Sequence, residues 1–180
     1  GIDPGGGRGY HLLVHLISTG IAAYGPWTGS ETAVVDAAQW LPAGSTLHER
    51  FDDDRIAATA ELLRRYLLSH GPATLRDFAW WTKLPLRTIR SALPLIADSV
   101  ESGAIPGHDE TAYWRPGLLD EYAVGEKDAM REILLPGFDE IVLGYPDRLA
   151  LMSAADHPAL VPGDNGVFKR AAIRRGRVVG

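Results

Sequence analysis

Two carboxylate-bearing motifs in the last third of the sequence have the residue types that acid–base chemistry requires. Asp139 and Glu140 lie in "PGFDEIVLGYPDR", and Asp147 follows beside Arg148. A carboxylate can activate water, or stabilise the cationic sugar that forms when a glycosidic bond breaks. The alternative is structural, with Asp147 and Arg148 bracing two parts of the chain in a buried network. The three acidic residues are therefore weak catalytic candidates, and the catalytic residues stay unknown.

Basic residues gather in two other places and predict contacts with a polyanion. In "LPLRTIRSAL" the helical spacing directs Arg87 and Arg90 away from the apolar side, and the terminal "KRAAIRRGR" has five cations. Arginine binds phosphate and guanine edges, and short hydroxyl side chains allow close approach. The candidate DNA-binding residues are Arg76, Lys83, Arg87, Thr88, Arg90, Ser91, Lys169, Arg170, Arg174, Arg175 and Arg177. The alternatives are a solvated helix face, and a basic tail that pairs with nearby acidic residues. The hypothesis requires both basic groups to share one accessible surface.

The charge distribution supports this hypothesis more than the net charge of −5 does. Residues 1–54 have a net charge of −5, residues 55–115 of +2, residues 116–165 of −7 and residues 166–180 of +5. Fifteen of the 18 basic residues are arginine, which suits forked phosphate contacts, although a GC-rich coding bias would give the same ratio.

Histidine and tryptophan pairs give weaker indications. His11 and His15 have the i, i+4 spacing of a helical metal pair, but no third ligand follows, and packing histidines are favoured. Trp80 and Trp81 could stack on a displaced base. Helical patterning favours instead one tryptophan in the core and the other sealing a domain junction. The chain has no cysteine, and we expect neither a metal nor another cofactor.

The elements between residues 55 and 117 predict a winged helix, because three helices precede a hairpin. A helix is expected over residues 56–70, and Thr74 with Asp77 forms a capping box that starts the next. Pro85 suits the first turn of the third helix, and Pro94 predicts its end or a kink. "SVESGAIPGHDETAYWRP" then predicts two strands whose loop tip includes His108.

The flanking regions predict a tandem α+β arrangement. A helix over residues 10–22 and an extended pair around residues 25–41 resemble the end of an earlier winged helix, followed by a polar connector over residues 50–55. Turns at Asn165-Gly166 and Arg175-Gly176 predict a β-rich C-terminal segment. The expected parts are a winged-helix remnant at 1–54, a winged helix at 55–117 and a truncated β-rich domain at 118–180.

Several motifs together give a family resemblance that covers most of residues 10–180. They are "GPAT" at 71–74, "FAWW" at 78–81, "LP" at 135–136, "FDE" at 138–140, "GY" at 144–145, "DR" at 147–148 and "NGVF" at 165–168. On these motifs the sequence resembles the AlkZ/YcaQ-type winged-helix DNA glycosylases.

The resemblance implies tandem winged helices, a C-terminal β-rich domain, and excision of alkylated bases or unhooking of crosslinks in duplex DNA. It also implies a catalytic Gln-x-Gln or Gln-x-Asp pair, which the one glutamine, Gln39 in "AQWLP", does not match. The pair is expected upstream of these residues or absent from this relative. A non-catalytic interaction module or a transcription regulator is the alternative. No apolar run is long enough for a membrane span, which predicts a cytoplasmic protein, nucleoid-associated when bound to DNA.

Overall fold

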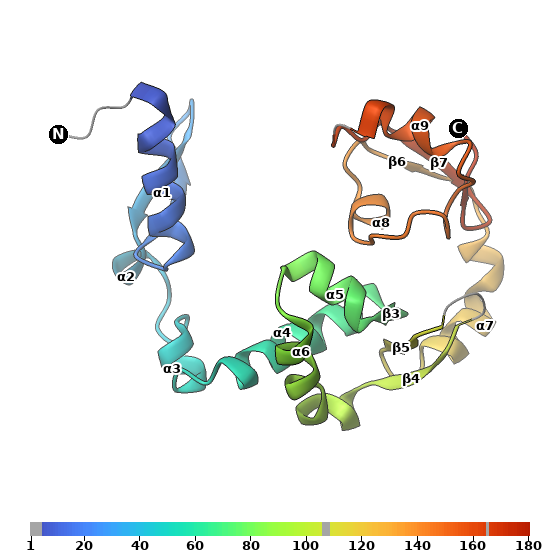
Figure 1. The fold of residues 1–180 in the computed structure, drawn as a ribbon, viewed down its shortest axis with the longest axis horizontal. Coiled ribbons are helices and arrows are strands. Elements are labelled where there is room, and N and C mark those ends of the chain that lie inside the picture. The colour runs from blue at the N-terminus through green and yellow to red at the C-terminus, as the bar shows by residue number, and fades with distance from the viewer. Residues whose placement is uncertain (1–4, 106–108, 165) are drawn as a thin grey trace. The chain divides into compact units, whose positions relative to one another are not determined.

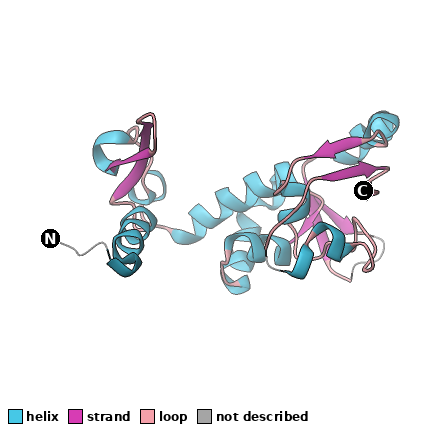
Figure 2. Cartoon of the chain, turned by 90° about the horizontal axis from the view of Figure 1, so that it is seen from above, coloured by secondary structure: helices cyan, strands magenta, loops and turns pink. Residues whose placement is uncertain are grey.

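The computed structural model describes every residue except 1–4, 106–108 and 165, so His108 and Asn165 lie outside the described residues. The chain divides into two compact units, residues 1–55 and 56–180. Both units contain helices and strands (Figure 2). Among the described residues, no helix has the length and apolar content needed to cross a bilayer.

The first unit combines short helices with one antiparallel strand pair (Figure 1). Its elements are η1 (Gly5–Gly7), α1 (Arg8–Ser18), β1 (Ala22–Trp27), β2 (Thr32–Asp36), α2 (Ala37–Trp40) and α3 (Leu47–Phe51). The extended pair is confirmed, but the strand predicted through Leu41 stops at Asp36. The carboxylate of Asp36 accepts a hydrogen bond from the Ala38 N–H and caps a helical turn instead. The predicted polar connector overlaps α3, which begins at a Thr46–Glu49 capping box that the pattern analysis missed.

The second unit begins with three helices and a three-stranded sheet. Its elements here are α4 (Arg55–His70), β3 (Ala73–Thr74), α5 (Leu75–Thr82), α6 (Leu86–Ala92), η2 (Leu93–Ser99), β4 (Glu101–Ala104) and β5 (Thr111–Trp114). The strand order is β3-β5-β4, with antiparallel pairs throughout. The three helices, the Thr74–Asp77 capping box and the break at Pro94 are confirmed.

The helices of this region enclose one apolar core. Leu63 and Leu67 of α4, Phe78 of α5 and Ile89 of α6 are each fully buried in a single cluster. Within α4, Leu63 and Leu67 are four residues apart, which puts them on one face of the helix. Burial of Ile89 fixes how α6 is rotated and therefore which of its side chains face solvent.

The remaining residues form a smaller sheet with helices around it. The elements are α7 (Leu118–Ala129), β6 (Ile133–Leu135), α8 (Glu140–Leu143), α9 (His157–Leu160), η3 (Pro162–Asp164), β7 (Ala171–Arg174) and β8 (Arg177–Val178). The strands are antiparallel in the order β6-β7-β8 and pack on a second core that includes Val142, Met152 and Ile173. This segment is more helical than the β-rich prediction, because α7 forms from "LLDEYAVGEKDA", whose residues are mostly good helix formers.

Candidate nucleic-acid interface

The corner between α5 and α6 presents two arginines to solvent. Lys83 ends α5 in a left-handed conformation (φ 61°), and Pro85 precedes the first turn of α6. Arg87 and Arg90 are exposed on α6, whereas Ile89 between them is fully buried. Within the described part of the chain, neither arginine has an ion-pair partner. Both guanidiniums are therefore available to an external anion.

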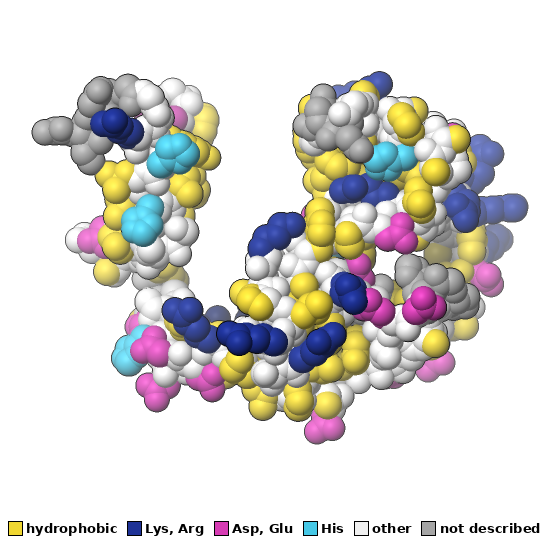
Figure 3. Space-filling model, viewed as in Figure 1, with side chains coloured by type: hydrophobic (Ala, Val, Ile, Leu, Met, Phe, Trp, Pro, Cys, Tyr) yellow, Lys and Arg dark blue, Asp and Glu magenta, His cyan; other side chains and the backbone are white. Residues whose placement is uncertain are grey.

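The neighbouring hydroxyl side chains differ in accessibility. Thr88 is half-buried, whereas Ser91 is exposed and its Oγ donates a hydrogen bond to the Arg87 carbonyl oxygen at 3.1 Å. The α6 surface, defined here as Arg87, Arg90 and Ser91, thus keeps three of the four predicted helix residues in solvent. Lys and Arg side chains gather on this part of the second unit (Figure 3).

Two other predicted DNA-binding residues already have internal partners. Arg76 forms an ion pair with Glu110 on the hairpin, and Arg174 of β7 forms one with Glu132. A paired arginine brings its carboxylate close to any incoming phosphate, and the carboxylate repels that phosphate. Pairing of the basic tail with the acidic segment, the alternative left open by the sequence, therefore applies to Arg174.

The other four cations of the C-terminal hairpin are exposed. The predicted turn is confirmed, since Arg175 (φ 51°) and Gly176 (φ 71°) join β7 to β8. These φ values suit a two-residue hairpin turn, and they turn the chain tightly enough to leave the flanking side chains in solvent. The hairpin surface is defined here as Lys169, Arg170, Arg175 and Arg177, for which no partner is found among the described residues.

The two basic surfaces lie apart on the second unit. In Figure 1, α6 lies at one end of the unit and β7 at the other, with α5 between them. A common surface would therefore have to extend past α5. The sequence-based hypothesis of one continuous surface does not follow from this arrangement, and each surface is argued separately below.

The carboxylate candidates make contacts that hold the chain together. Asp139 caps α8 by accepting the Ile141 N–H at 3.0 Å, and Asp147 accepts the Leu149 N–H at 2.8 Å. Asp147 and Arg148 form no ion pair with each other in the described structure. Arg148 instead donates to the Val142 carbonyl oxygen at 3.0 Å and stacks on a ring of the second core. These contacts are structural, and the predicted Asp147–Arg148 network is wrong in its partners.

Glu140 joins α8 to the helices of the first core. Its Oε1 accepts the Trp81 indole N–H at 2.9 Å and lies 3.3 Å from Nε2 of His70. Close by, the Tyr145 hydroxyl donates to the His70 carbonyl oxygen at 2.5 Å. A Cβ added to Gly144 would lie 2.8 Å from the Glu140 carbonyl oxygen, so this position requires glycine. Residues of three family motifs thus form one junction, and Trp81 confirms the prediction of a junction tryptophan.

Burial at this junction keeps its phenols protonated. Burial, aided by the negative charges of Asp77 and Glu140, raises the pKa of Tyr145 to about 12. The pKa of Tyr66 is raised for the same first reason, and its hydroxyl has no hydrogen-bond partner among the described residues. Neither tyrosine is therefore poised to act as a base near neutral pH.

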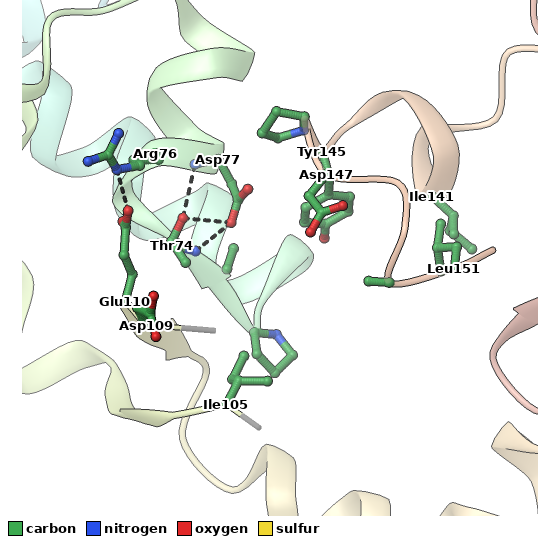
Figure 4. Close-up of a pocket in the computed structure, with 14 residues that line it drawn as sticks. Thr74, Arg76, Asp77, Ile105, Asp109, Glu110, Ile141, Tyr145, Asp147 and Leu151 are labelled. Atoms are coloured by element: carbon green, nitrogen blue, oxygen red, sulfur yellow. Dashed lines mark hydrogen bonds and ion pairs between the residues drawn. The ribbon is translucent and has the colours of Figure 1, made fainter. Parts of the chain in front are cut away.

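A cavity of about 600 Å³ opens beside this junction, next to the first turn of α5 (Figure 4). Its lining residues are Pro72, Ala73, Thr74, Arg76, Asp77, Ile105, Asp109, Glu110, Ile141, Tyr145, Pro146, Asp147, Ala150 and Leu151. The lining has four carboxylates against one guanidinium, and that guanidinium belongs to the ion pair with Glu110. The Asp77 carboxylate also accepts hydrogen bonds from the Thr74 N–H at 2.7 Å and hydroxyl at 2.8 Å. The net negative charge of the lining repels phosphate and argues against a contact with the DNA backbone in this cavity.

The predictions for the histidine pair on α1 and for one tryptophan of the pair on α5 were wrong. His11 and His15 are exposed on α1 and do not pack in a core, and no group of three potential metal ligands occurs among the described residues. Neither tryptophan fills the core, since Trp80 is 36% and Trp81 40% exposed, and Phe78 is the fully buried aromatic residue of α5. The burial of Phe78 agrees with the helical pattern, but the pattern alone did not rank the three aromatic residues Phe78, Trp80 and Trp81.

Comparison with known proteins gives one family and one structural neighbour. Residues 7–180 match the family model described as DNA glycosylase AlkZ-like. The DNA glycosylase AlkZ of Streptomyces sahachiroi has a similar fold, with a TM-score of 0.70 and 22% sequence identity. That similarity covers 97% of this chain and 46% of the other, so the chain spans about half the length of its neighbour. No curated protein sequence matches the chain.

Proposed function

Because the chain belongs to the AlkZ-like DNA glycosylase family, we propose that it is the DNA-holding part of a protein that acts on damaged DNA. The observation that carries the proposal is the α6 surface. Two unpaired arginines extend from a short helix whose rotation is fixed by the burial of Ile89. Guanidiniums on such a helix can bind phosphate oxygens or the edge of guanine in the major groove.

We propose that residues 55–117 act as a winged helix on duplex DNA. The order of α4, α5, α6 and the β4–β5 hairpin, with β3 completing the sheet, supports this assignment. In that arrangement α6 is the recognition helix. The helix α1 and the β1–β2 pair of residues 1–54 are the proposed remnant of a preceding winged helix, and residues 118–180 are the proposed C-terminal domain, within the same compact unit as the proposed winged helix.

The hairpin surface is proposed as a second contact with the DNA backbone. Its four cations are exposed, and the β7–β8 turn holds Arg175 at the tip. Non-specific phosphate contacts of this kind fix orientation on the duplex without reading its sequence. Since α6 and β7 lie apart, the two surfaces would contact separate phosphates.

Catalysis is proposed for the intact protein and is not assigned to residues of this chain. The reaction would be hydrolysis of the N-glycosidic bond of an alkylated or crosslinked base, without a metal or organic cofactor. Asp139, Glu140 and Asp147 have structural contacts that account for them, and Gln39 does not match the expected glutamine pair.

Binding to a short duplex tests the proposal. We expect measurable affinity at low salt that falls steeply as salt rises, and a marked loss of affinity when Arg87→Ala and Arg90→Ala are combined. Leu95→Ala is the control, because Leu95 is exposed and lies outside both basic surfaces, so its replacement should leave the affinity unchanged. No detectable binding at low salt would support the interaction-module alternative. A strong preference for one undamaged sequence over a lesion would support a transcription regulator.

A further inference from the structure

The two adjacent tryptophans of α5 have different surroundings. Trp81 packs against Tyr66, with 5.3 Å between ring centroids, and donates its indole N–H to Glu140. Trp80 belongs to neither buried cluster and has no aromatic neighbour within the described part of the chain. Trp81 therefore has a structural role at the junction with Glu140. No comparable packing contact of the Trp80 ring is found among the described residues.

Trp80 forms part of a stripe along the solvent side of α5. Arg76 and Trp80 are spaced i, i+4, which puts them on one face of α5, and Lys83 caps the end of the helix in a left-handed conformation. The Lys83 ammonium lies over the Trp80 ring, 4.1 Å from its centroid. Because the Lys83 N–H is bonded to the Ala79 carbonyl oxygen at 2.8 Å, its backbone is fixed where the side chain can lie back over the indole. One face of the indole is therefore directed at a cation that water can reach.

A cation resting on an exposed indole is a weak and replaceable contact, worth about 0.5–1 kcal/mol at such sites. A nucleobase offers a larger flat surface, and stacking on an aromatic side chain is the usual way to hold an unpaired base. In an intact duplex the faces of the bases are covered by their neighbours. Only a base outside the stack can therefore lie on Trp80.

We propose that Trp80 is a stacking site for one unpaired nucleobase of DNA, and that the base replaces the Lys83 ammonium on the indole. Lys83 then binds the phosphate next to that base. Arg87, in the first turn of α6, lies four residues further along the chain. Arg76 contributes less, since Glu110 already holds it. This inference rests on the proposed DNA binding and adds to it a preference for DNA with a displaced base.

Two duplexes that differ in one feature test the site. One is fully paired, and the other has the same sequence with a single unpaired thymine. We expect the 180-residue chain to bind the second duplex more tightly, by on the order of 10-fold. Trp80→Ala should abolish this preference and leave affinity for the paired duplex within about two-fold, because stacking is the contact that it removes. Trp80→Phe, which keeps a flat ring, should retain most of the preference.

A second readout and a control separate stacking from a general loss of fold. The fluorescence of 2-aminopurine at the unpaired position should be quenched when the unaltered chain binds, and not when Trp80→Ala binds. Tyr122→Ala removes another exposed aromatic ring, on α7, and should leave the preference unchanged. A preference retained by Trp80→Ala, or absence of quenching with the unaltered chain, would overturn the inference while DNA binding stands. Absence of binding to either duplex at low salt would instead overturn the proposed function.

Discussion

Pairing between arginine and carboxylate should decide which cations of this chain bind DNA. Arg76 and Arg174 have internal partners, whereas Arg87 of α6 and Arg177 of β8 have none among the described residues. Arg174 and Arg177 are cross-strand neighbours in the β7–β8 register, so they differ in pairing more than in position. Substitution of Arg87 can therefore be compared with that of Arg76, and substitution of Arg177 with that of Arg174.

The expected magnitude follows from counterion release. A cation that neutralises one phosphate contributes about −0.9 to the slope of log affinity against log salt concentration. Seven of the predicted DNA-binding cations have no ion-pair partner among the described residues, namely Lys83, two on the α6 surface and four on the hairpin surface, and they would give a slope of about −6 if all engage. Arg87→Ala or Arg177→Ala should make the slope shallower by about 0.9, equivalent to about an eight-fold difference over a tenfold rise in salt. Arg76→Ala and Arg174→Ala should leave it nearly unchanged, because Glu110 and Glu132 remain close to any phosphate that approaches.

The assay is fluorescence anisotropy with one duplex over a series of salt concentrations, and circular dichroism checks that each variant is folded. The two ion pairs are solvent-exposed, and exposed pairs are individually weak. If Arg76→Ala lowered the slope as much as Arg87→Ala, DNA would be opening the ion pair, and the reasoning from static pairing would be refuted. An unchanged slope in Arg87→Ala would remove α6 from the interface.

Three further predictions concern stability, measured as the free energy of unfolding in urea. Phe78→Ala should lower it by about 3–5 kcal/mol, because the ring is fully buried among α4, α5 and α6; a loss below about 1 kcal/mol would contradict that packing. Tyr145→Phe should cost about 1 kcal/mol by removing the hydrogen bond to the His70 carbonyl oxygen, and no loss would argue that the junction is open. The Arg64 and Arg65 side chains lower the pKa of Glu61 from 4.5 to about 2. The two ion pairs of Glu61 therefore stabilise the fold above pH 4.5, and this stabilisation is lost as the pH falls towards 2. Glu61→Gln should therefore cost about 0.5–1 kcal/mol at pH 7 and nothing near pH 2, whereas an equal cost at both values would count against the ion pairs.

Local sequence patterns predicted the helical core because the features that define its helices and turns depend on residues close in sequence. The period of Leu63 and Leu67, the Thr74–Asp77 capping box and the turn at Arg175-Gly176 each depend on residues close in sequence. Helix period, cap and turn chemistry are the features that short-range rules describe best. The α6 surface followed correctly from the same period, since its exposed side is set by a buried neighbour.

The state of the individual cations could not be predicted in this way. Glu110 approaches Arg76 from the β4–β5 hairpin, and Glu132 approaches Arg174 because β6 pairs with β7. The division of roles between Trp80 and Trp81 has the same origin, because Glu140 is brought to α5 from another part of the chain. Composition and spacing gave candidate residues, but tertiary contacts determine which of their side chains have a partner among the described residues.

The junction explains why residues that could do acid–base chemistry need not do it. Glu140 receives one N–H from α5 and lies against His70 of α4, while Tyr145 ties the following turn to the end of α4. These contacts require a close approach of the backbone, which Gly144 allows because even a methyl group there would meet the Glu140 carbonyl oxygen at 2.8 Å. A carboxylate that accepts the Trp81 indole N–H and lies against His70 at a junction is poorly placed to take a proton from water. The motif "DEIVLGY" is therefore explained by the need to hold the C-terminal sheet against the helical core, and the proposed DNA contacts are better sought at the cations for which the described residues offer no partner.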